Sequence, residues 1–224
     1  MSEDESIRHS KAEYVETATD GEERARLEAA NSLRQAARMK EIIWAAVDGE
    51  RPFKLRPSMI QDLNRCAIEG LDSFAGNWRP GGIEISKSNH VPPPAHKVAE
   101  YVEEMCDYVN DNWEERTAVH LASFAMWRLN WIHPFTDGNG RTSRAVSYVV
   151  LCVREGVLLP GSKTIPEQIT DKHRATYYDA IEAADQRYDA GQKFSAETVV
   201  EMEELIAGLL ADQLAYLHRA ATGQ

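Results

Sequence analysis

The chain alternates long stretches of helical periodicity with short runs of turn residues. Between Glu22 and about Val47, apolar side chains recur three to five positions apart, as on one face of an α-helix. The same spacing predicts further helices over about 58–71, 95–110, 116–132, 142–155, 171–188 and 196–219. No linker between these segments is long enough to separate them cleanly, so the pattern predicts a mainly helical bundle.

Residues 73–94, SFAGNWRPGGIEISKSNHVPPP, interrupt the helical pattern. Their glycines and prolines stop any helix, while GIEIS alternates apolar and polar residues as a short strand does. The three prolines at the end predict an extended approach to the next helix. Residues 1–20 are polar and show no clear period, so we expect a loosely held arm before the first helix.

Composition and charge exclude several classes of protein. The 224 residues are 43% apolar and 27% charged, which is typical of a soluble globular protein. The net charge of -11 argues against broad nucleic-acid binding, which needs basic surface. A charged N-terminal stretch and the lack of a long apolar run predict a cytoplasmic protein with no membrane span. Cys66, Cys106 and Cys152 are too few and too far apart for a disulfide framework or zinc site.

The twelve residues 133–144, HPFTDGNGRTSR, carry the candidate chemistry. The proline after His133 disfavours helix at the preceding residue, so this imidazole should stand at a helix end. Its neutral form, which can accept a proton, is available at cell pH. Asp137 is a single carboxylate of the kind that holds Mg²⁺ together with phosphate oxygens. Gly138 and Gly140 have no side chains, which lets backbone N–H groups approach a phosphate closely.

A helix should begin just after these glycines and place two cations at its start. Arg141 and Arg144 are three positions apart, so they share a face of the first turn and lean back over the loop. Guanidinium groups bind phosphate oxygens well. Taken singly, the turn residues, the arginine pair and the histidine have ordinary structural explanations, and Phe135 is most simply a core anchor. Taken together, they predict a triphosphate cradle with a base at its edge.

This stretch resembles the signature of the Fic family, and every specified position of that signature is filled. The segment AGNWRPGGIEIS…HVPPP resembles the family's flap and the approach to the next helix. The segment IPEQI…YYDAIEAAD resembles its nucleotide-side helix, so the resemblance covers about Glu28 to Tyr188. It implies an all-α Fic-type helical bundle with one small β-hairpin flap. The implied activity is transfer of AMP from MgATP to a Ser, Thr or Tyr hydroxyl of a target protein.

Carried over by position, the resemblance implies a role for each residue of the signature. His133 would be the general base that takes the proton from the target hydroxyl, and Asp137 would hold Mg²⁺. The phosphate contacts would come from Gly138, Asn139, Gly140, Arg141 and Arg144. Either Tyr177 or Tyr178 would lie against the adenine. Phosphocholine transfer also occurs in the family, so ATP as the donor is an inference.

The flap residues Gly82, Ile83, Glu84 and Ile85 would dock the target. An exposed strand edge can pair with the target's backbone and so align a hydroxyl near the base. That mode recognises extended backbone more than side chains. A plain surface strand is the alternative interpretation of the same residues.

Regulation departs from the pattern of many family members. Those proteins carry an inhibitory helix in which Ser or Thr precedes Glu by four positions, and that Glu pairs with the arginine equivalent to Arg144. The segment Thr19–Glu23 has this spacing, but Arg24 follows where Gly or Asn is expected, and Thr19 equally suits a helix N-cap. An inhibitory partner protein, another form of control and an unrestrained enzyme all stay open.

We expect three parts: an arm over 1–25, a catalytic core over 26–190 and a C-terminal helix over 191–224. The apolar stripe of the last segment fits packing on its own bundle, a partner helix or a homodimer. Protein adenylyltransferase is the leading functional hypothesis. The alternatives are removal of AMP from a target, a toxin that uses the same chemistry, and a non-catalytic nucleotide sensor, which would need no base.

Overall fold

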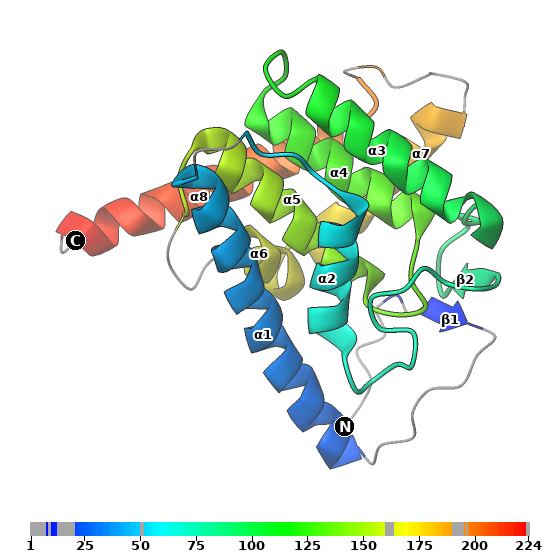
Figure 1. Cartoon of the computed structure of the whole chain (residues 1–224). Coiled ribbons are helices and arrows are strands. Elements are labelled where there is room, and N and C mark those ends of the chain that lie inside the picture. The colour runs from blue at the N-terminus through cyan, green and yellow to red at the C-terminus, as the bar shows by residue number, and fades with distance from the viewer. Residues whose placement is uncertain are drawn as a thin grey trace.

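The computed structural model describes residue 8 and residues 10–12, 21–49, 52–159, 164–189, 195 and 197–222, and confirms the predicted fold class. Figure 1 shows a bundle of helices with one small pair of strands at its edge. The helices are α1 (Gly21–Val47), α2 (Pro57–Ile68), α3 (Val98–Asp111), α4 (Ala118–Ile132), α5 (Asn139–Glu155), α6 (Ile165–Asp171), α7 (Arg174–Asp189) and α8 (Val200–Thr222). A 3₁₀ turn, η1 (Ala95–Lys97), leads into α3.

Helix α6 is the one that apolar periodicity did not predict. Its seven residues offer only Ile165 and Ile169 as buried apolar side chains, which is too few to show a period. The Glu167 carboxylate accepts hydrogen bonds from the backbone N–H and the hydroxyl of Thr164, both at 2.8 Å. A cap of this kind fixes the first turn of a short helix that periodicity does not reveal.

The core is built around α4, which is buried on nearly every side. Its neighbours are α5, α3, α7 and α8, whereas α5 is also covered by α1 and α2. Trp127 and Phe124 of α4 are among the largest buried side chains. A helix that is apolar all round needs cover on all faces. The turn that joins α4 to α5 is therefore fixed from both sides by packed helices.

The C-terminal helix α8 packs along α4, α6 and α7. Its buried side includes Met202, Ile206 and Leu209, so the apolar stripe of this segment is turned into the bundle. Further along, Gln213 is buried and its side-chain amide donates to the Tyr148 hydroxyl at 3.1 Å. Leu214 on the same helix is 48% exposed.

The two strands come from distant parts of the chain. Strand β1 (Ser10–Ala12) pairs antiparallel with β2 (Ile83–Ile85), with Ser10 opposite Ile85 and Ala12 opposite Ile83 (Figure 1). The flap strand was predicted, but its partner is the N-terminal arm, where no regular structure was expected. Three residues are too few to show a period of two, and the pairing depends on an edge more than seventy residues away.

Two further expectations concern the membrane and the cysteines. None of the helices in the described part of the chain is long and apolar enough to cross a membrane.

Cys106 and Cys152 are buried and Cys66 is half-buried, all as free thiols. Burial raises the pKa of the Cys106 thiol to about 12, so this side chain behaves as a small apolar residue.

Candidate functional site

His133 lies at the C-terminal end of α4, as predicted from the proline that follows it. Its backbone is left-handed, with φ of 51° and ψ of 58°, and its N–H donates to Leu129 O at 3.0 Å. Among the described residues, only Lys87 is another non-glycine residue with positive φ. A left-handed backbone at a residue other than glycine costs about 1–2 kcal/mol. Such strain persists only where the surroundings hold the residue in place.

Arg79 holds this helix end in place. Its side chain is buried, and Nε donates to the carbonyl oxygen of His133 at 2.8 Å. Nη1 donates to Gly81 O at 2.7 Å and Nη2 donates to Pro93 O, which ties the flap and the proline segment to the same point. Desolvation lowers the pKa of the guanidinium. The sequence analysis missed this residue, although an arginine among glycines and prolines suggests a side chain that binds backbone carbonyls.

The imidazole of His133 is in the form that accepts a proton. Nδ1 lies 3.2 Å from the carbonyl oxygen of Asn130, which only accepts, so the proton is on Nδ1 and the lone pair on Nε2. Nε2 in turn lies 2.8 Å from Oγ of Ser10 in β1. Desolvation is the main cause that lowers the pKa of His133 to about 4. The charges of Arg79 and His90 also lower it, whereas the hydrogen bond to Asn130 raises it. The side chain is therefore neutral at physiological pH.

Asp137 and Arg141 bind each other in this structure. Oδ2 of Asp137 lies 3.0 Å from Nη2 of Arg141, and Oδ1 accepts from the N–H of Gly138 at 2.5 Å. Arg141 also donates to Ala67 O of α2 at 3.2 Å. Both side chains stay partly exposed, so they are within reach of a ligand.

Two constraints favour glycine at position 138: its left-handed backbone and the lack of room for a Cβ. Its φ is 75°, and a Cβ there would lie 2.7 Å from Cγ2 of Ile68 and 3.1 Å from Nδ2 of Asn64. No other residue type fits without a shift of α2. The turn between α4 and α5 thus runs in direct contact with α2.

Asn64 of α2 is a second residue that the sequence analysis missed. It is fully buried, and its Nδ2 donates to Asp137 O at 3.0 Å and to Oγ1 of Thr142 at 3.2 Å. Its Oδ1 accepts from the N–H of Gly76 at 2.9 Å. The side chain therefore fixes the loop, the start of α5 and the beginning of the flap segment. No signal near position 64 in the sequence indicates this role.

Asn139 closes the loop on itself. Its Oδ1 accepts from the Phe135 N–H at 2.9 Å, and its Nδ2 donates to Phe135 O at 2.8 Å. The ring of Phe135 is buried and packs on Trp78 with 5.0 Å between ring centroids. Since the Asn139 side chain is used in this way, its phosphate contact would come from the backbone N–H. The first N–H groups of α5 have no partner inside the helix and suit an anion.

The side chain of Arg144 in α5 lies next to Gly140, in the first turn of the helix. A Cβ on Gly140 would lie 3.2 Å from Nη1 of Arg144, so the glycine leaves the arginine room. Among the residues that the structure describes, none forms a hydrogen bond or ion pair with the Arg144 side chain. Of the segment considered for self-inhibition, Thr19 lies outside the described residues, and Glu23 is exposed in the first turn of α1.

The two tyrosines considered for the adenine differ in exposure. Tyr177 is 2% exposed, and its hydroxyl is bonded to Nδ2 of Asn130 at 2.8 Å and to Oγ of Ser143 at 3.3 Å. Tyr178 is half-buried, and the guanidinium of Arg8 lies 4.2 Å from the centre of its ring. Tyr178 is therefore the more accessible of the two, and Arg8 covers one face of its ring.

The donor set at the loop fits a magnesium ion held with a nucleotide. No group of three or more His, Cys, Asp or Glu side chains gathers as a metal site within the described ranges. Mg²⁺ commonly takes one or two carboxylates and completes its shell with phosphate oxygens and water. The partly exposed carboxylate of Asp137 supplies one hard oxygen ligand beside the start of α5.

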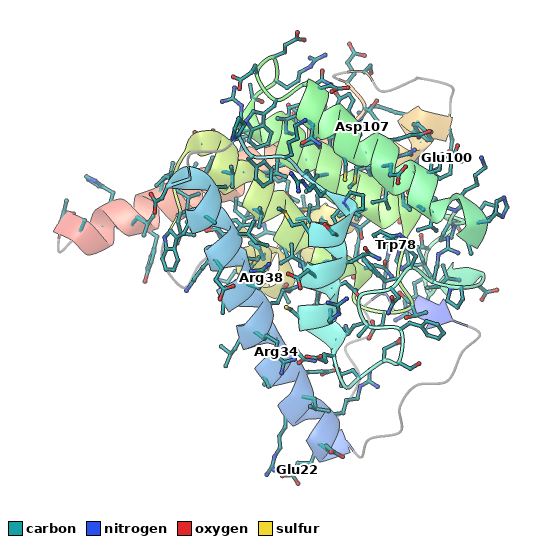
Figure 2. All side chains as sticks on the ribbon, viewed as in Figure 1. Glu22, Arg34, Arg38, Trp78, Glu100 and Asp107 are labelled. Atoms are coloured by element: carbon teal, nitrogen blue, oxygen red, sulfur yellow. The ribbon has the colours of Figure 1, made fainter. Side chains whose placement is uncertain are left out.

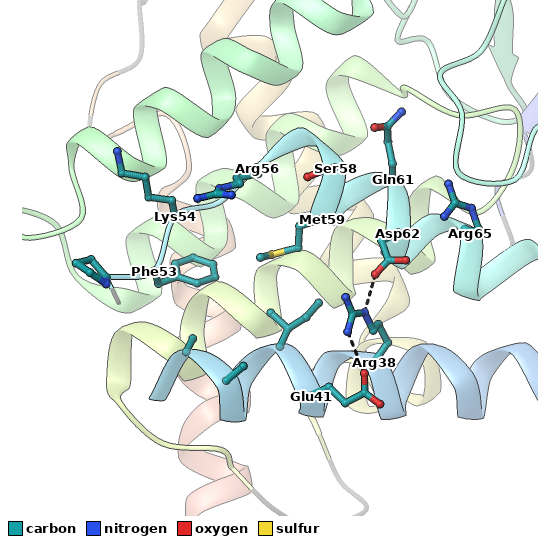
Figure 3. A pocket seen from close by; sticks show the side chains of 14 residues that line it. Arg38, Glu41, Phe53, Lys54, Arg56, Ser58, Met59, Gln61, Asp62 and Arg65 are labelled. Carbon is teal, nitrogen blue, oxygen red and sulfur yellow. Dashed lines mark hydrogen bonds and ion pairs between the residues drawn. The ribbon is translucent and has the colours of Figure 1, made fainter. Parts of the chain in front are cut away.

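A surface hollow lies elsewhere, between α1 and α2. It measures about 680 Å³ and is lined by Arg38, Asp62 and Arg65 among others (Figure 3). Arg38 bonds Asp62 at 2.6 Å and Glu41 at 2.9 Å, so its charge is already used to join the two helices. Figure 2 places Arg34 and Arg38 along α1, far from Trp78 at the flap. This hollow has no part in the predicted site.

The family model for the Fic/DOC family matches residues 54–151 of this chain. Protein adenylyltransferase fic-1 of Caenorhabditis briggsae is 32% identical over 160 residues, which cover 65% of this chain and 31% of that protein. Protein adenylyltransferase Fic of Drosophila willistoni is 30% identical over 129 residues, or 57% of this chain and 24% of that protein. The chain thus spans less than a third of the length of these curated relatives.

Solved structures share the fold. A Fic-domain-containing signalling protein of Bacteroides thetaiotaomicron superposes with a TM-score of 0.67 at 21% identity, covering 87% of this chain and 73% of that one. A fragment of Fic-1 from Caenorhabditis elegans superposes with a TM-score of 0.61 at 21% identity, covering 93% and 60%. At these identities the likeness establishes the helical architecture.

Proposed function

Since the chain carries a Fic domain, which matches over residues 54–151, we propose that it is a protein adenylyltransferase that moves AMP from MgATP to a hydroxyl side chain of a target protein. The observation that carries this proposal is the contact of a serine hydroxyl with Nε2 of His133 at 2.8 Å. The base thus faces a hydroxyl with its lone pair, at the distance from which proton transfer takes place.

The reaction that follows is attack of the target oxygen on the α-phosphorus of ATP. The new O–P bond forms as the bond to the bridging oxygen of pyrophosphate breaks, and the hydroxyl proton passes to Nε2 of His133. The neutral imidazole needs no prior deprotonation at physiological pH, because desolvation lowers its pKa to about 4. A positioned base contributes roughly 10²–10⁴ in rate.

The start of α5 would hold the phosphates. Backbone N–H groups at Asn139 and Gly140 would face the anion, joined by that of Gly138 if it leaves Oδ1 of Asp137, and Arg141 and Arg144 would bind the β- and γ-phosphates. Asp137 would hold Mg²⁺, which when bound spreads the charge of the phosphate oxygens. Arg141 has to exchange its ion pair with Asp137 for phosphate, so binding the nucleotide rearranges this pair.

The adenine and the target would lie on either side of His133. Tyr177 is buried and Tyr178 is only half-buried, so we assign the adenine contact to Tyr178, where the base would take the place of Arg8 over the ring. The flap residues 82–85 would align the target by backbone pairing along β2. In the described residues that edge is already paired with β1.

A nucleotide sensor is the less favoured alternative. A sensor must bind the phosphates, but it has no use for a general base, here a neutral imidazole whose lone pair faces a hydroxyl. Removal of AMP would favour a carboxylate beside Arg144, and the described parts of the chain place none there. An inhibitory partner protein that supplies such a carboxylate to Arg144 remains compatible with this proposal.

Labelling with two forms of ATP tests the proposal. The protein is incubated with Mg²⁺, a cell lysate and ATP labelled at either the α- or the γ-phosphate. Compared with lysate alone, the added protein should produce new bands from the α-label and none from the γ-label, because the β- and γ-phosphates leave as pyrophosphate. His133→Ala should lower this labelling by roughly 10²–10⁴. It should leave ATP binding measurable by calorimetry, and equal labelling by variant and parent would exclude His133 as the base.

A further inference from the structure

The chain's own N-terminal arm occupies the place where a target is expected. Strand β1 pairs with the flap, and Ser10 lies 2.8 Å from the nitrogen that would accept a target's proton. We propose that Ser10 is a self-modification site: the protein transfers AMP from MgATP to Oγ of its own Ser10, within one chain. This inference rests on the adenylyltransferase function proposed above.

Contacts on both sides of the Ser10 hydroxyl support its role as an acceptor. Nε2 of His133 accepts its hydrogen, since the proton of that imidazole is on Nδ1. Nδ2 of Asn139, the first residue of α5, lies 3.4 Å from the same oxygen. The hydroxyl therefore stands between the base and the helix end that would hold the phosphates. A segment that merely covered the flap would need no hydroxyl at this point.

The register of the strand pair sets which residue faces the base. Ser10 is opposite Ile85, and successive side chains of a strand point to opposite faces. A slip of one residue would turn the serine away from His133. The backbone pairing with β2 thus selects Ser10 as the side chain presented to Nε2.

Arg8 anchors the arm on the far side of the base. Its backbone N–H donates to the Tyr178 hydroxyl at 3.3 Å, and its guanidinium forms an ion pair with Glu182 of α7. The arm is therefore held at two points, at α7 through Arg8 and at the flap through the strand pair that begins with Ser10. An acceptor fixed in this way gains the rate advantage of an intramolecular reaction.

The transfer is balanced by atoms already named. Oγ of Ser10 forms a bond to the α-phosphorus, the bond from that phosphorus to the pyrophosphate oxygen breaks, and pyrophosphate leaves. The hydroxyl proton goes to Nε2 of His133. Since the modified oxygen has no hydrogen left, each chain can accept one AMP at this position.

Intact-mass spectrometry of the full chain after incubation with MgATP tests the proposal. We expect a gain of one AMP, mapped by peptide fragmentation to Ser10. Ser10→Ala should reduce the gain to the background measured with His133→Ala, whereas Ser10→Thr keeps a hydroxyl and should still be labelled. Ser58→Ala, which removes an exposed hydroxyl on α2, is the matched control and should label like the parent.

The outcomes separate this inference from the proposed function. Labelled lysate proteins with no AMP on Ser10, or an AMP gain that survives Ser10→Ala, would overturn the inference and leave the adenylyltransferase in place. No α-label on any protein would overturn both.

Transfer within one chain has its own test. The first-order rate constant of self-labelling should stay the same when the protein is diluted. In a mixture of Ser10→Ala and His133→Ala chains, the second protein has the acceptor and the first has the base. We expect no label in this mixture. Label on the His133→Ala chain, or a rate constant that falls with dilution, would show transfer between chains and contradict the proposal.

Discussion

The two sides of His133 are built in different ways. On the nucleotide side, the buried side chains of Asn64 and Asn139 bond the loop backbone, and Arg79 bonds the end of α4. On the acceptor side, three residues of β1 lie along three residues of the flap. An isolated pair of such short strands is marginally stable in water. On the proposed function, the contrast predicts that the nucleotide would be held by a rigid loop and that the segment paired with the flap could be exchanged.

On the proposed function, this difference would let one site serve two acceptors. The backbone edge of β2 can pair with an extended segment, so the chain's own arm and a target would compete for the same hydrogen bonds. The loop backbone allows no such exchange, because the buried side chains of Asn64 and Asn139 hold the carbonyl oxygens of Asp137 and Phe135. The first N–H groups of α5 would be left for the phosphates. Perturbing the loop should therefore lower ATP affinity strongly, whereas perturbing the arm should act mainly on the acceptor and only slightly on ATP affinity.

Gly138→Ala is expected to have the largest effect on stability and on ATP binding. A residue with a side chain costs about 1–2 kcal/mol in a left-handed backbone. The contact of its Cβ with Ile68 at 2.7 Å adds overpacking, typically about 1–3 kcal/mol. We expect a lower melting temperature and loss of ATP binding measurable by calorimetry.

Gly82→Ala is the matched control on the acceptor side. An added Cβ there meets no atom within 4 Å, and its φ lies outside the left-handed region. The change in unfolding free energy should stay within about 0.5 kcal/mol, and the ATP affinity should equal that of the parent. Equal losses in the two alanine variants would contradict the contrast between loop and flap.

Arg144→Ala should act on the nucleotide without acting on the fold. A hydrogen bond to a charged group contributes about 1.5–3 kcal/mol, so ATP affinity should fall roughly 10- to 100-fold. The melting temperature should not change, since the described residues leave this side chain without a bond.

Arg141→Ala is the comparison for that variant. Arg141 also bonds Ala67 O and Asp137, so its loss should lower both ATP affinity and melting temperature. Unchanged ATP affinity in Arg144→Ala would remove that residue from the phosphate site.

Acid should stop the reaction only at low pH. The imidazole works as a base in its neutral form, and desolvation, Arg79 and His90 lower the pKa of His133 to about 4, against Asn130 and Asp137, which raise it. The single-turnover labelling rate should therefore be flat at neutral and mildly acidic pH. Below about pH 4 it should fall about tenfold per pH unit.

The control for the acid series is circular dichroism at each pH, which separates loss of the base from loss of the fold. A rate that already halves near pH 6.5, the ordinary histidine value, would show that the imidazole is solvated in the reacting complex.

The signature could be found from the sequence because its parts are close together. Twelve consecutive residues contain the base, the carboxylate, the glycines and the arginines, so their geometry follows from one helix end, one turn and one helix start. Arg79 and Asn64 act on that loop from 54 and 73 positions away, and Ser10 reaches His133 across 123. Such contacts depend on how helices and strands pack. The glycines and prolines around Arg79 give a local hint of its role, but no local pattern indicates the contacts of Asn64 and Ser10. The helix boundaries were predicted to within a few residues for the same local reason.

Arg8→Ala should have the smallest effect on ATP affinity. It should raise the affinity, whereas the loop variants lower it. Arg8 covers the ring of Tyr178, the side chain assigned to the adenine, and pairs with Glu182, which is about half exposed. Contacts of this kind contribute about 1 kcal/mol, so their removal should raise ATP affinity by roughly fivefold. Glu182→Gln removes the ion pair but keeps the guanidinium over the ring, so it should give an intermediate gain. Weaker ATP binding in Arg8→Ala would mean that the arginine helps to hold the nucleotide, and the arm would then belong to the rigid side of the site.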